Sequence, residues 1–187
     1  EVRDDWTGTS FTLEAAMEQA TDGHWQVTYL KNYRDYLDAI TPLHNEDIAK
    51  YSEATKNIVA SYNEKLTAYK ARFAALSQTS SGTFTTEQKA GLEALVEKEV
   101  IPTLQARQQE LASVEVPPGA RYLADQRQQA TELTLKAWQH FLAGIKNDDP
   151  DELAQAETLN KQELAVDLRV DDIIRHTAIS RSIPNLP

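Results

Sequence analysis

The chain of 187 residues contains no cysteine, which excludes disulfide bonds, thiol nucleophiles, thiolate metal sites and c-type haem attachment. Glycine is scarce, with 6 residues, and strong helix formers dominate from residue 11 to residue 175. No segment approaches the run of about 18 apolar residues that a membrane-spanning helix needs. These absences favour a helical protein without a transmembrane segment.

Basic residues are also few, because 19 Lys and Arg face 29 Asp and Glu and leave a formal net charge of −10. Nucleic acids and anionic membranes both require a basic surface on their partner. We therefore expect no nucleic acid among the partners. The hydrophobic fraction of 41% and the charged fraction of 26% are ordinary for a folded domain. The length suits one domain with a real core.

Turn and cap residues divide the chain into helices with short connections. A first helical stretch is expected over residues 10–40, with a break at Asp22-Gly23, and Thr41-Pro42 is expected to open a second helix that runs to residue 76. The polar segment 77–86 interrupts the helical pattern. A third helix should begin at Thr85, whose hydroxyl can form a capping box with Gln88, and should kink at Pro102.

Pro117-Pro118 ends the third helix, and a fourth is expected from residue 118 to residue 146. In the segment NDDPDEL, residues 147–153, Asp149 is a good N-cap, Pro150 fits the first helical position, and Glu152 can reach back to the cap. This fifth helix should run to about residue 179.

The expected fold is all-α, an antiparallel up-down helical bundle of four long helices plus an N-terminal helical arm. One domain would span residues 1–187, with residues 1–9 as an N-terminal extension and residues 180–187 as an extended C-terminal tail.

Aromatic residues recur at helical spacing in the stretch GHWQVTYLKNYRDYL, residues 23–37. On a helix, Trp25, Tyr29, Tyr33 and Tyr36 would share one face. The favoured interpretation is that this face packs in the core, because tyrosine suits a core that is partly open to water. The alternative is an aromatic groove that binds a small ligand, with Trp25, Tyr29, Tyr33, Tyr62 and Trp138 as ligand-binding residues.

Catalytic and metal-binding motifs are missing from the sequence. The histidines are isolated, at positions 24, 44, 140 and 176, and no Glu-x-x-His, HExxH, GxSxG or glycine-rich phosphate loop occurs. We therefore expect no catalytic residue, no metal ligand and no cofactor. One alternative stays open, because Met17 and His176 lie at positions similar to those of the iron ligands of haem-binding four-helix cytochromes.

In general character the chain resembles the small helical-bundle domains of bacterial exported proteins and lipoproteins. The likeness and the start at Glu1, without an initiating Met, favour a periplasmic, cell-surface or secreted location over the cytoplasm. The leading hypothesis for the function is a non-enzymatic interaction or scaffold module with a protein partner. The alternatives are a small-ligand sensor or carrier and, third, a haem- or metal-binding bundle.

Overall fold

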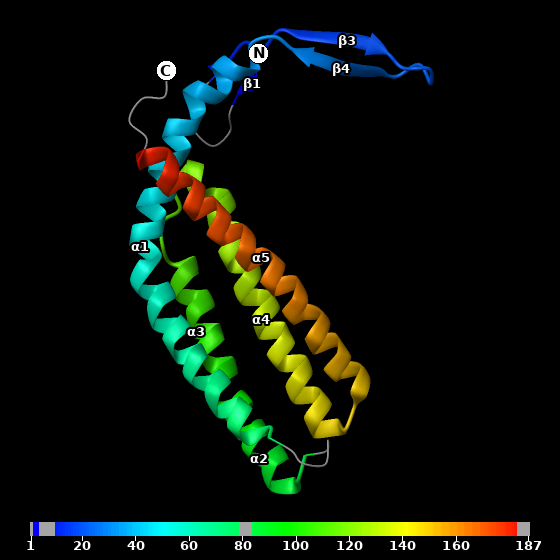
Figure 1. Ribbon diagram of the computed structural model, residues 1–187, viewed down its shortest axis with the longest axis vertical. Coiled ribbons are helices and arrows are strands. Elements are labelled where there is room, and N and C mark those ends of the chain that lie inside the picture. Colours follow the sequence, from blue (N-terminus) through cyan, green and yellow to red (C-terminus); the bar gives the residue numbers. More distant parts are fainter. Residues whose placement is uncertain (1, 4–9, 79–83, 183–187) are drawn as a thin grey trace.

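The computed structural model describes residues 2–3, 10–78 and 84–182, and at some of these positions, Tyr33 among them, it describes the backbone alone. Four long helices run up and down beside one another (Figure 1), so the expected antiparallel bundle is confirmed. The middle elements α2, η1 and α3 continue one another as one long helix. The helical elements are α1 (Tyr33–Leu76), α2 (Thr86–Leu95), the π-helical turn η1 (Val96–Val100), α3 (Ile101–Ala112), the 3₁₀ turn η2 (Pro118–Ala120), α4 (Arg121–Asn147) and α5 (Pro150–Ser182).

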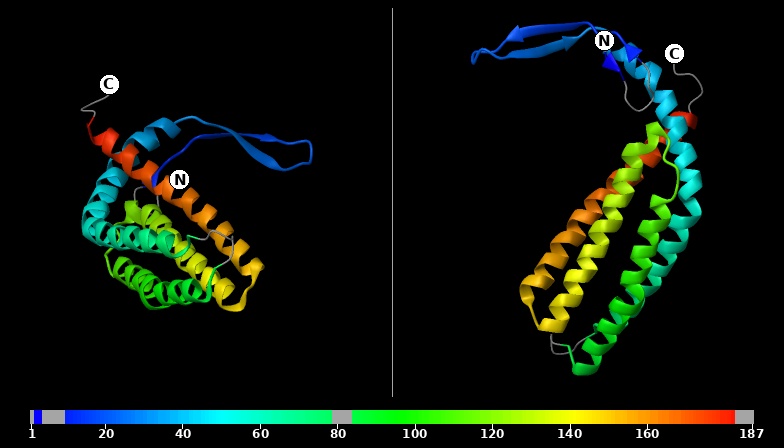
Figure 2. Two further views of the ribbon diagram at one scale, coloured as in Figure 1. Left: turned by 60° about the horizontal axis from the view of Figure 1, so that its bottom comes forward. Right: turned by 180° about the vertical axis from the view of Figure 1, so that it is seen from behind.

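The prediction of an N-terminal helical arm is wrong, because the described residues before α1 form antiparallel strands. These are β1 (Val2–Arg3) paired with β2 (Ser10–Phe11), and β3 (Ala15–Gln19) paired with β4 (Trp25–Leu30). The β3–β4 hairpin projects from one end of the bundle (Figures 1 and 2). In β4, WQVTYL alternates large and polar side chains and is rich in aromatic and β-branched residues, which favour a strand.

Helix α1 continues through Pro42, where the sequence predicts a boundary between two helices. A proline inside a helix lacks the N–H that would bond to the carbonyl group of Asp38, and it costs about 3 kcal/mol. Ile40, in the stretch before the proline, is buried at 8% exposure. This burial offsets part of the cost of the proline, and the 44 residues form one helix.

Just before Pro102, where the sequence predicts a kink, the structure has a π-helical turn. The backbone N–H of Ile101 donates to the carbonyl oxygen of Val96, five residues earlier, at the end of η1. Pro102 is the second residue of α3 and follows this turn directly, so its missing N–H falls where the helix changes its hydrogen-bond pattern. The extra residue of a π turn shifts the helix face that follows it.

Two of the expected helix caps are confirmed in atomic detail. Thr85 Oγ1 accepts from the backbone N–H of Gln88 at 3.2 Å, and Gln88 Oε1 accepts from the backbone N–H of Thr85 at 2.9 Å. Asp149 Oδ1 accepts from the backbone N–H groups of Asp151 at 2.9 Å and of Glu152 at 3.4 Å. The Glu152 side chain does not return to this cap as expected. It contacts His140 Nδ1 on α4 at 2.5 Å and so ties the two last helices together.

The ends of the chain differ from the expected extended segments. Helix α5 runs to Ser182, so the tail does not begin at residue 180, and residues 183–187 lie outside the described residues. Within the expected N-terminal extension, Val2 pairs with Phe11 and Arg3 with Ser10.

In the part of the chain that the structure describes, the core includes two apolar clusters, and buried polar side chains lie between them along α1 and α4. One cluster is built on Tyr51, Ala120 and Leu123, and the other on Leu95, Val100 and Leu104. The buried polar side chains between them are Thr55 on α1 and Gln126, Arg127 and Thr131 on α4. On α4, Arg127 lies between Leu123 of the first cluster and Leu135 beside the second. The bundle therefore holds a buried cation near its middle.

Candidate functional site

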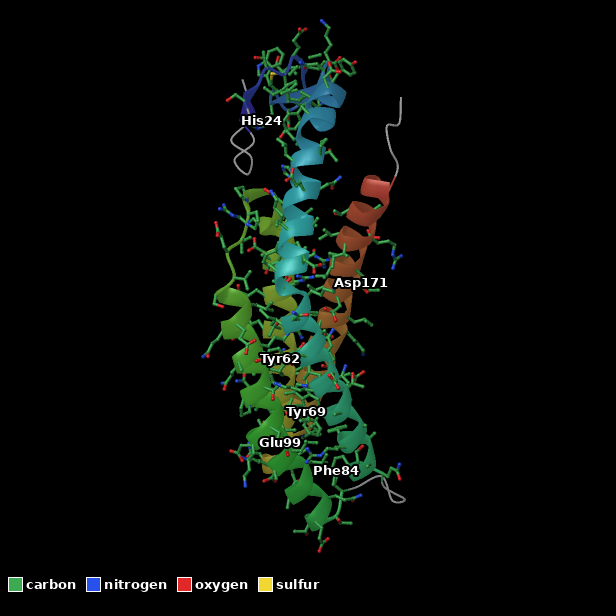
Figure 3. All side chains as sticks on the ribbon, turned by 90° about the vertical axis from the view of Figure 1, so that its left-hand side faces the viewer. His24, Tyr62, Tyr69, Phe84, Glu99 and Asp171 are labelled. Atoms are coloured by element: carbon green, nitrogen blue, oxygen red, sulfur yellow. The ribbon has the colours of Figure 1, made fainter. Side chains whose placement is uncertain are left out.

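The structure does not bring the five predicted ligand-binding residues together. Trp25 and Tyr29 lie on β4, Tyr33 is the first residue of α1, and its side chain lies outside the described part. Tyr62 and Trp138 belong to α1 and α4 in the bundle. Figure 3 shows His24, the neighbour of Trp25, at one end of the molecule and Tyr62 well down the bundle. The predicted shared helix face is therefore absent.

Tyr62 is a buried bridge between α1 and α3. Its side chain is 4% exposed, and its hydroxyl donates to Glu110 Oε1 at 2.6 Å. This hydrogen bond, together with burial, raises the pKa of Tyr62 to about 12. Such a contact stabilises the helix pair, as the core interpretation of the tyrosines predicts.

We expect Tyr62→Phe to lower the free energy of unfolding by about 1–2 kcal/mol near neutral pH, because Glu110 loses its donor. The folded chain raises the pKa of Tyr62 from 10.0 to about 12, so its contribution to stability is complete below pH 10 and disappears as the pH rises toward 12. Urea unfolding of both proteins across this range measures the difference. A deficit that persists unchanged at the alkaline end would contradict the assignment.

Trp138 packs in an aromatic cluster. Its ring lies edge-on to Phe73 at a centroid distance of 5.4 Å and to Phe141 at 5.8 Å. The same residue lines a cavity of about 320 Å³ with Phe84 and Leu153. Its ring contacts are those of a core residue, and its ligand-binding role stays a prediction.

The β3–β4 hairpin is closed by a tight turn, where the sequence predicts a break. Gly23 has a φ of +86°, a left-handed conformation that glycine adopts without strain. Asp22 Oδ1 accepts from the backbone N–H of His24 at 3.1 Å, and the N–H of Ala20 donates to the carbonyl oxygen of His24 at 2.8 Å. The Asp-Gly pair thus forms the turn of a hairpin and does not interrupt a helix.

Asn32 and Lys31 hold the base of the hairpin at the start of α1. The Asn32 side chain accepts from the backbone N–H of Glu14 at 3.0 Å and donates to the carbonyl oxygen of Thr12 at 2.6 Å. Lys31 Nζ lies 2.8 Å from Glu14 Oε2. These bonds join the segment before β3 to the residues between β4 and α1, so they close the base of the hairpin.

Four large apolar side chains of the hairpin are exposed, and we call them the hairpin surface: Met17 at 51%, Trp25 at 64%, Val27 at 55% and Tyr29 at 60%. Met17 pairs with Val27, and Gln19 with Trp25. The register shifts between Ala16 and Met17, so Tyr29 pairs with Ala16 and lies on the opposite face. Both faces of the hairpin therefore present apolar groups to the solvent.

The alternative iron ligands do not occupy the positions that a four-helix cytochrome requires. Met17 lies on β3 and not on a helix, whereas His176 is an exposed residue of α5. Within residues 10–78 and 84–182, no group of three or more His, Asp or Glu side chains is placed to hold a metal ion. In the part of the chain that the structure describes, no helix combines the length and hydropathy required to span a bilayer.

Sequence reasoning missed the hairpin surface, although a signal for it exists. Trp25, Val27 and Tyr29 alternate with polar residues, as in a strand, but Trp25, Tyr29, Tyr33 and Tyr36 also fit a helix.

Comparison with known proteins does not decide between functions, because the chain matches no family model, no curated protein and no solved structure.

Proposed function

We propose that the chain is a non-enzymatic interaction module that binds a protein partner through the hairpin surface. The observation that carries the proposal is the exposure of Met17, Trp25, Val27 and Tyr29, 51–64% each, on a sheet that has two strands among the described residues. Exposed groups of large apolar side chains mark interaction sites, and Trp and Tyr are enriched in such contacts. An isolated two-stranded hairpin is marginally stable, so a partner that covers it also stabilises it.

A protein fits this surface better than an anionic membrane does. The hairpin and its base carry Glu14, Glu18 and Asp22, and Lys31 is already paired with Glu14. Anionic lipids attract basic segments and repel acidic ones. Strand β4 itself, WQVTYL, has no charged residue, so it offers backbone edge groups and apolar side chains to a partner without repulsion.

The test is photo-crosslinking from a benzoylphenylalanine placed at residue 25 in cells that produce the full chain. The matched control carries the same group in place of Leu164 on α5, which is 59% exposed, close to the 64% of Trp25. We expect a covalent adduct with a protein from residue 25 and none from residue 164. The purified chain treated in the same way shows whether the partner is a second copy.

The variant Trp25→Ser separates binding from folding. Because Trp25 is mostly exposed, we expect a change of less than about 0.5 kcal/mol in the free energy of unfolding. Adduct formation from a second crosslinking group at residue 27 should nevertheless fall in this variant. Equal crosslinking from residues 25 and 164, or a blue shift of Trp fluorescence with anionic vesicles alone, would contradict the proposal.

A further inference from the structure

A cavity of about 540 Å³ opens between α1, α4 and α5. Its volume falls within the range of roughly 300–1,000 Å³ that small-molecule sites occupy. Ile48 and Val59 of α1 and Ile174 of α5 form apolar walls, and α4 contributes Arg127. The cavity is not the aromatic groove expected from the sequence, since none of the five predicted residues lines it.

Arg127 is a buried cation at this cavity. Its side chain is 7% exposed, Nη1 donates to Thr55 Oγ1, and the guanidinium carbon lies 5.5 Å from the centroid of the Tyr51 ring. The Thr55 hydroxyl in turn donates to the carbonyl oxygen of Tyr51 at 2.8 Å. Thr55 and Tyr51 thus hold the guanidinium in place with neutral groups, and neither of them supplies a negative charge to balance it.

No carboxylate of the described residues forms an ion pair with Arg127. Burial lowers the pKa of Arg127; Tyr51 opposes this lowering, and Arg107 adds to it as a nearby like charge. Arg107 differs in this respect, because Asp167 and Glu163 lie near it and oppose the lowering of its pKa by burial. A buried charge without a counter-charge costs several kcal/mol, so an anion beside Arg127 would be strongly favoured.

A second group at the cavity also lacks a partner. Ser52, which lines the same cavity, has a buried hydroxyl that makes no hydrogen bond within the described part of the chain. Ser52 and Thr55 are three positions apart on α1, so they lie on neighbouring turns of one helix face. The cavity therefore has one buried cation in its lining, and beside it a buried hydroxyl that gains a partner if the Ser52 side chain turns toward a bound anion.

We propose that this cavity binds a small monocarboxylate with an apolar tail, the carboxylate pairing with Arg127 and Ser52 and the tail lying along Ile48, Val59 and Ile174. A guanidinium binds a planar carboxylate through two parallel hydrogen bonds. One buried cation balances one negative charge. At the rim, Glu53 and Lys56 carry opposite charges, so they add no net positive charge for a doubly charged phosphate.

The test is isothermal titration of the full chain with decanoate, below the concentration at which it forms micelles. Decan-1-ol, with the same tail but no charge, and acetate, with the same head but no tail, are the matched ligands. We expect decanoate to bind about tenfold or more tightly than either one, because charged hydrogen bonds and apolar burial both contribute. Decyl phosphate should bind more weakly than decanoate.

Two variants and one control test which residues bind the carboxylate head group. Arg127→Met keeps the length of the side chain and removes its charge, so decanoate should bind about tenfold or more weakly, while decan-1-ol binding is unchanged. Ser52→Ala should weaken decanoate binding by a smaller factor, about threefold to tenfold. The control Arg72→Met removes a cation that is paired with Glu99 on the surface, and it should change neither affinity.

The ligand series on the unaltered chain decides the outcome even where a variant does not fold. Equal affinity for decanoate and decan-1-ol would overturn the proposal, as would equal affinity for decanoate and acetate. A folded Arg127→Met chain that binds decanoate as tightly as the unaltered chain would overturn it as well.

Discussion

Replacement of Leu104 by alanine is expected to lower the free energy of unfolding by about 2–5 kcal/mol. Leu104 is 0% exposed and belongs, with Leu95 and Val100, to the cluster that includes the aromatic residues around Trp138. The truncation removes buried apolar surface and leaves a cavity in this cluster that rigid helices cannot fill. Urea or thermal unfolding measures the change, with the loss of helix followed by circular dichroism at about 222 nm.

The matched control is Leu168→Ala on α5. Leu168 is 62% exposed, so the same chemical change should alter the free energy of unfolding by less than about 0.5 kcal/mol. Equal losses at the two positions would mean that the cluster around Leu104 is not a core.

Gly119→Ala is expected to cost about 1–3 kcal/mol, because the added methyl group meets the backbone of another helix. A Cβ atom at Gly119 would lie 2.8 Å from the Cα atom of His44 and 3.1 Å from the Cβ atom of Asp47 on α1. The backbone N–H of Gly119 also donates to Asp47 Oδ2 at 2.9 Å, which ties η2 closely to α1. Relief of the clash would stretch or break this hydrogen bond.

The control for Gly119 is Gly91→Ala, inside α2. There the nearest atom to an added Cβ would be Cδ2 of Leu76, at 3.1 Å, the end of a side chain that can turn aside. Alanine is favoured over glycine within a helix by about 0.5–1 kcal/mol. We expect Gly91→Ala to melt at the same temperature as the unaltered chain or above it. If Gly119→Ala also melts at the temperature of the unaltered chain or above it, η2 does not approach α1 as closely as the structure shows.

Local signals account for most of what could be predicted about the helices. The capping box of Thr85 and Gln88 and the cap at Asp149 involve residues within three positions of each other, so a sequence reveals them directly. The irregularity at Pro102 follows from the missing N–H of one residue. Its form, a π-helical turn over Val96–Val100, is seen only in the structure.

The segment 10–32 could not be assigned by periodicity alone, because its aromatic residues fit both a helix and a strand. The contacts that hold the strands are long-range, from Asn32 to Glu14 and Thr12 and from Lys31 to Glu14. At Pro42 the local and the tertiary effects are also opposed. The proline by itself favours a break in the helix, whereas the burial of Ile40 favours a continuous α1.

The sequence by itself determined the bundle: four long helices, most of their ends and their antiparallel order. Helix periodicity, caps and short connections act within a few residues of each other. Only the tertiary structure decided the two surfaces that we propose to be functional. The hairpin surface exists because strand pairing leaves Trp25 and Tyr29 outside the bundle. The carboxylate site exists because Ser52 and Arg127, 75 positions apart, line the same cavity. No acidic residue of the described part is placed to pair with Arg127. A local sequence pattern cannot show that such a distant counter-charge is missing.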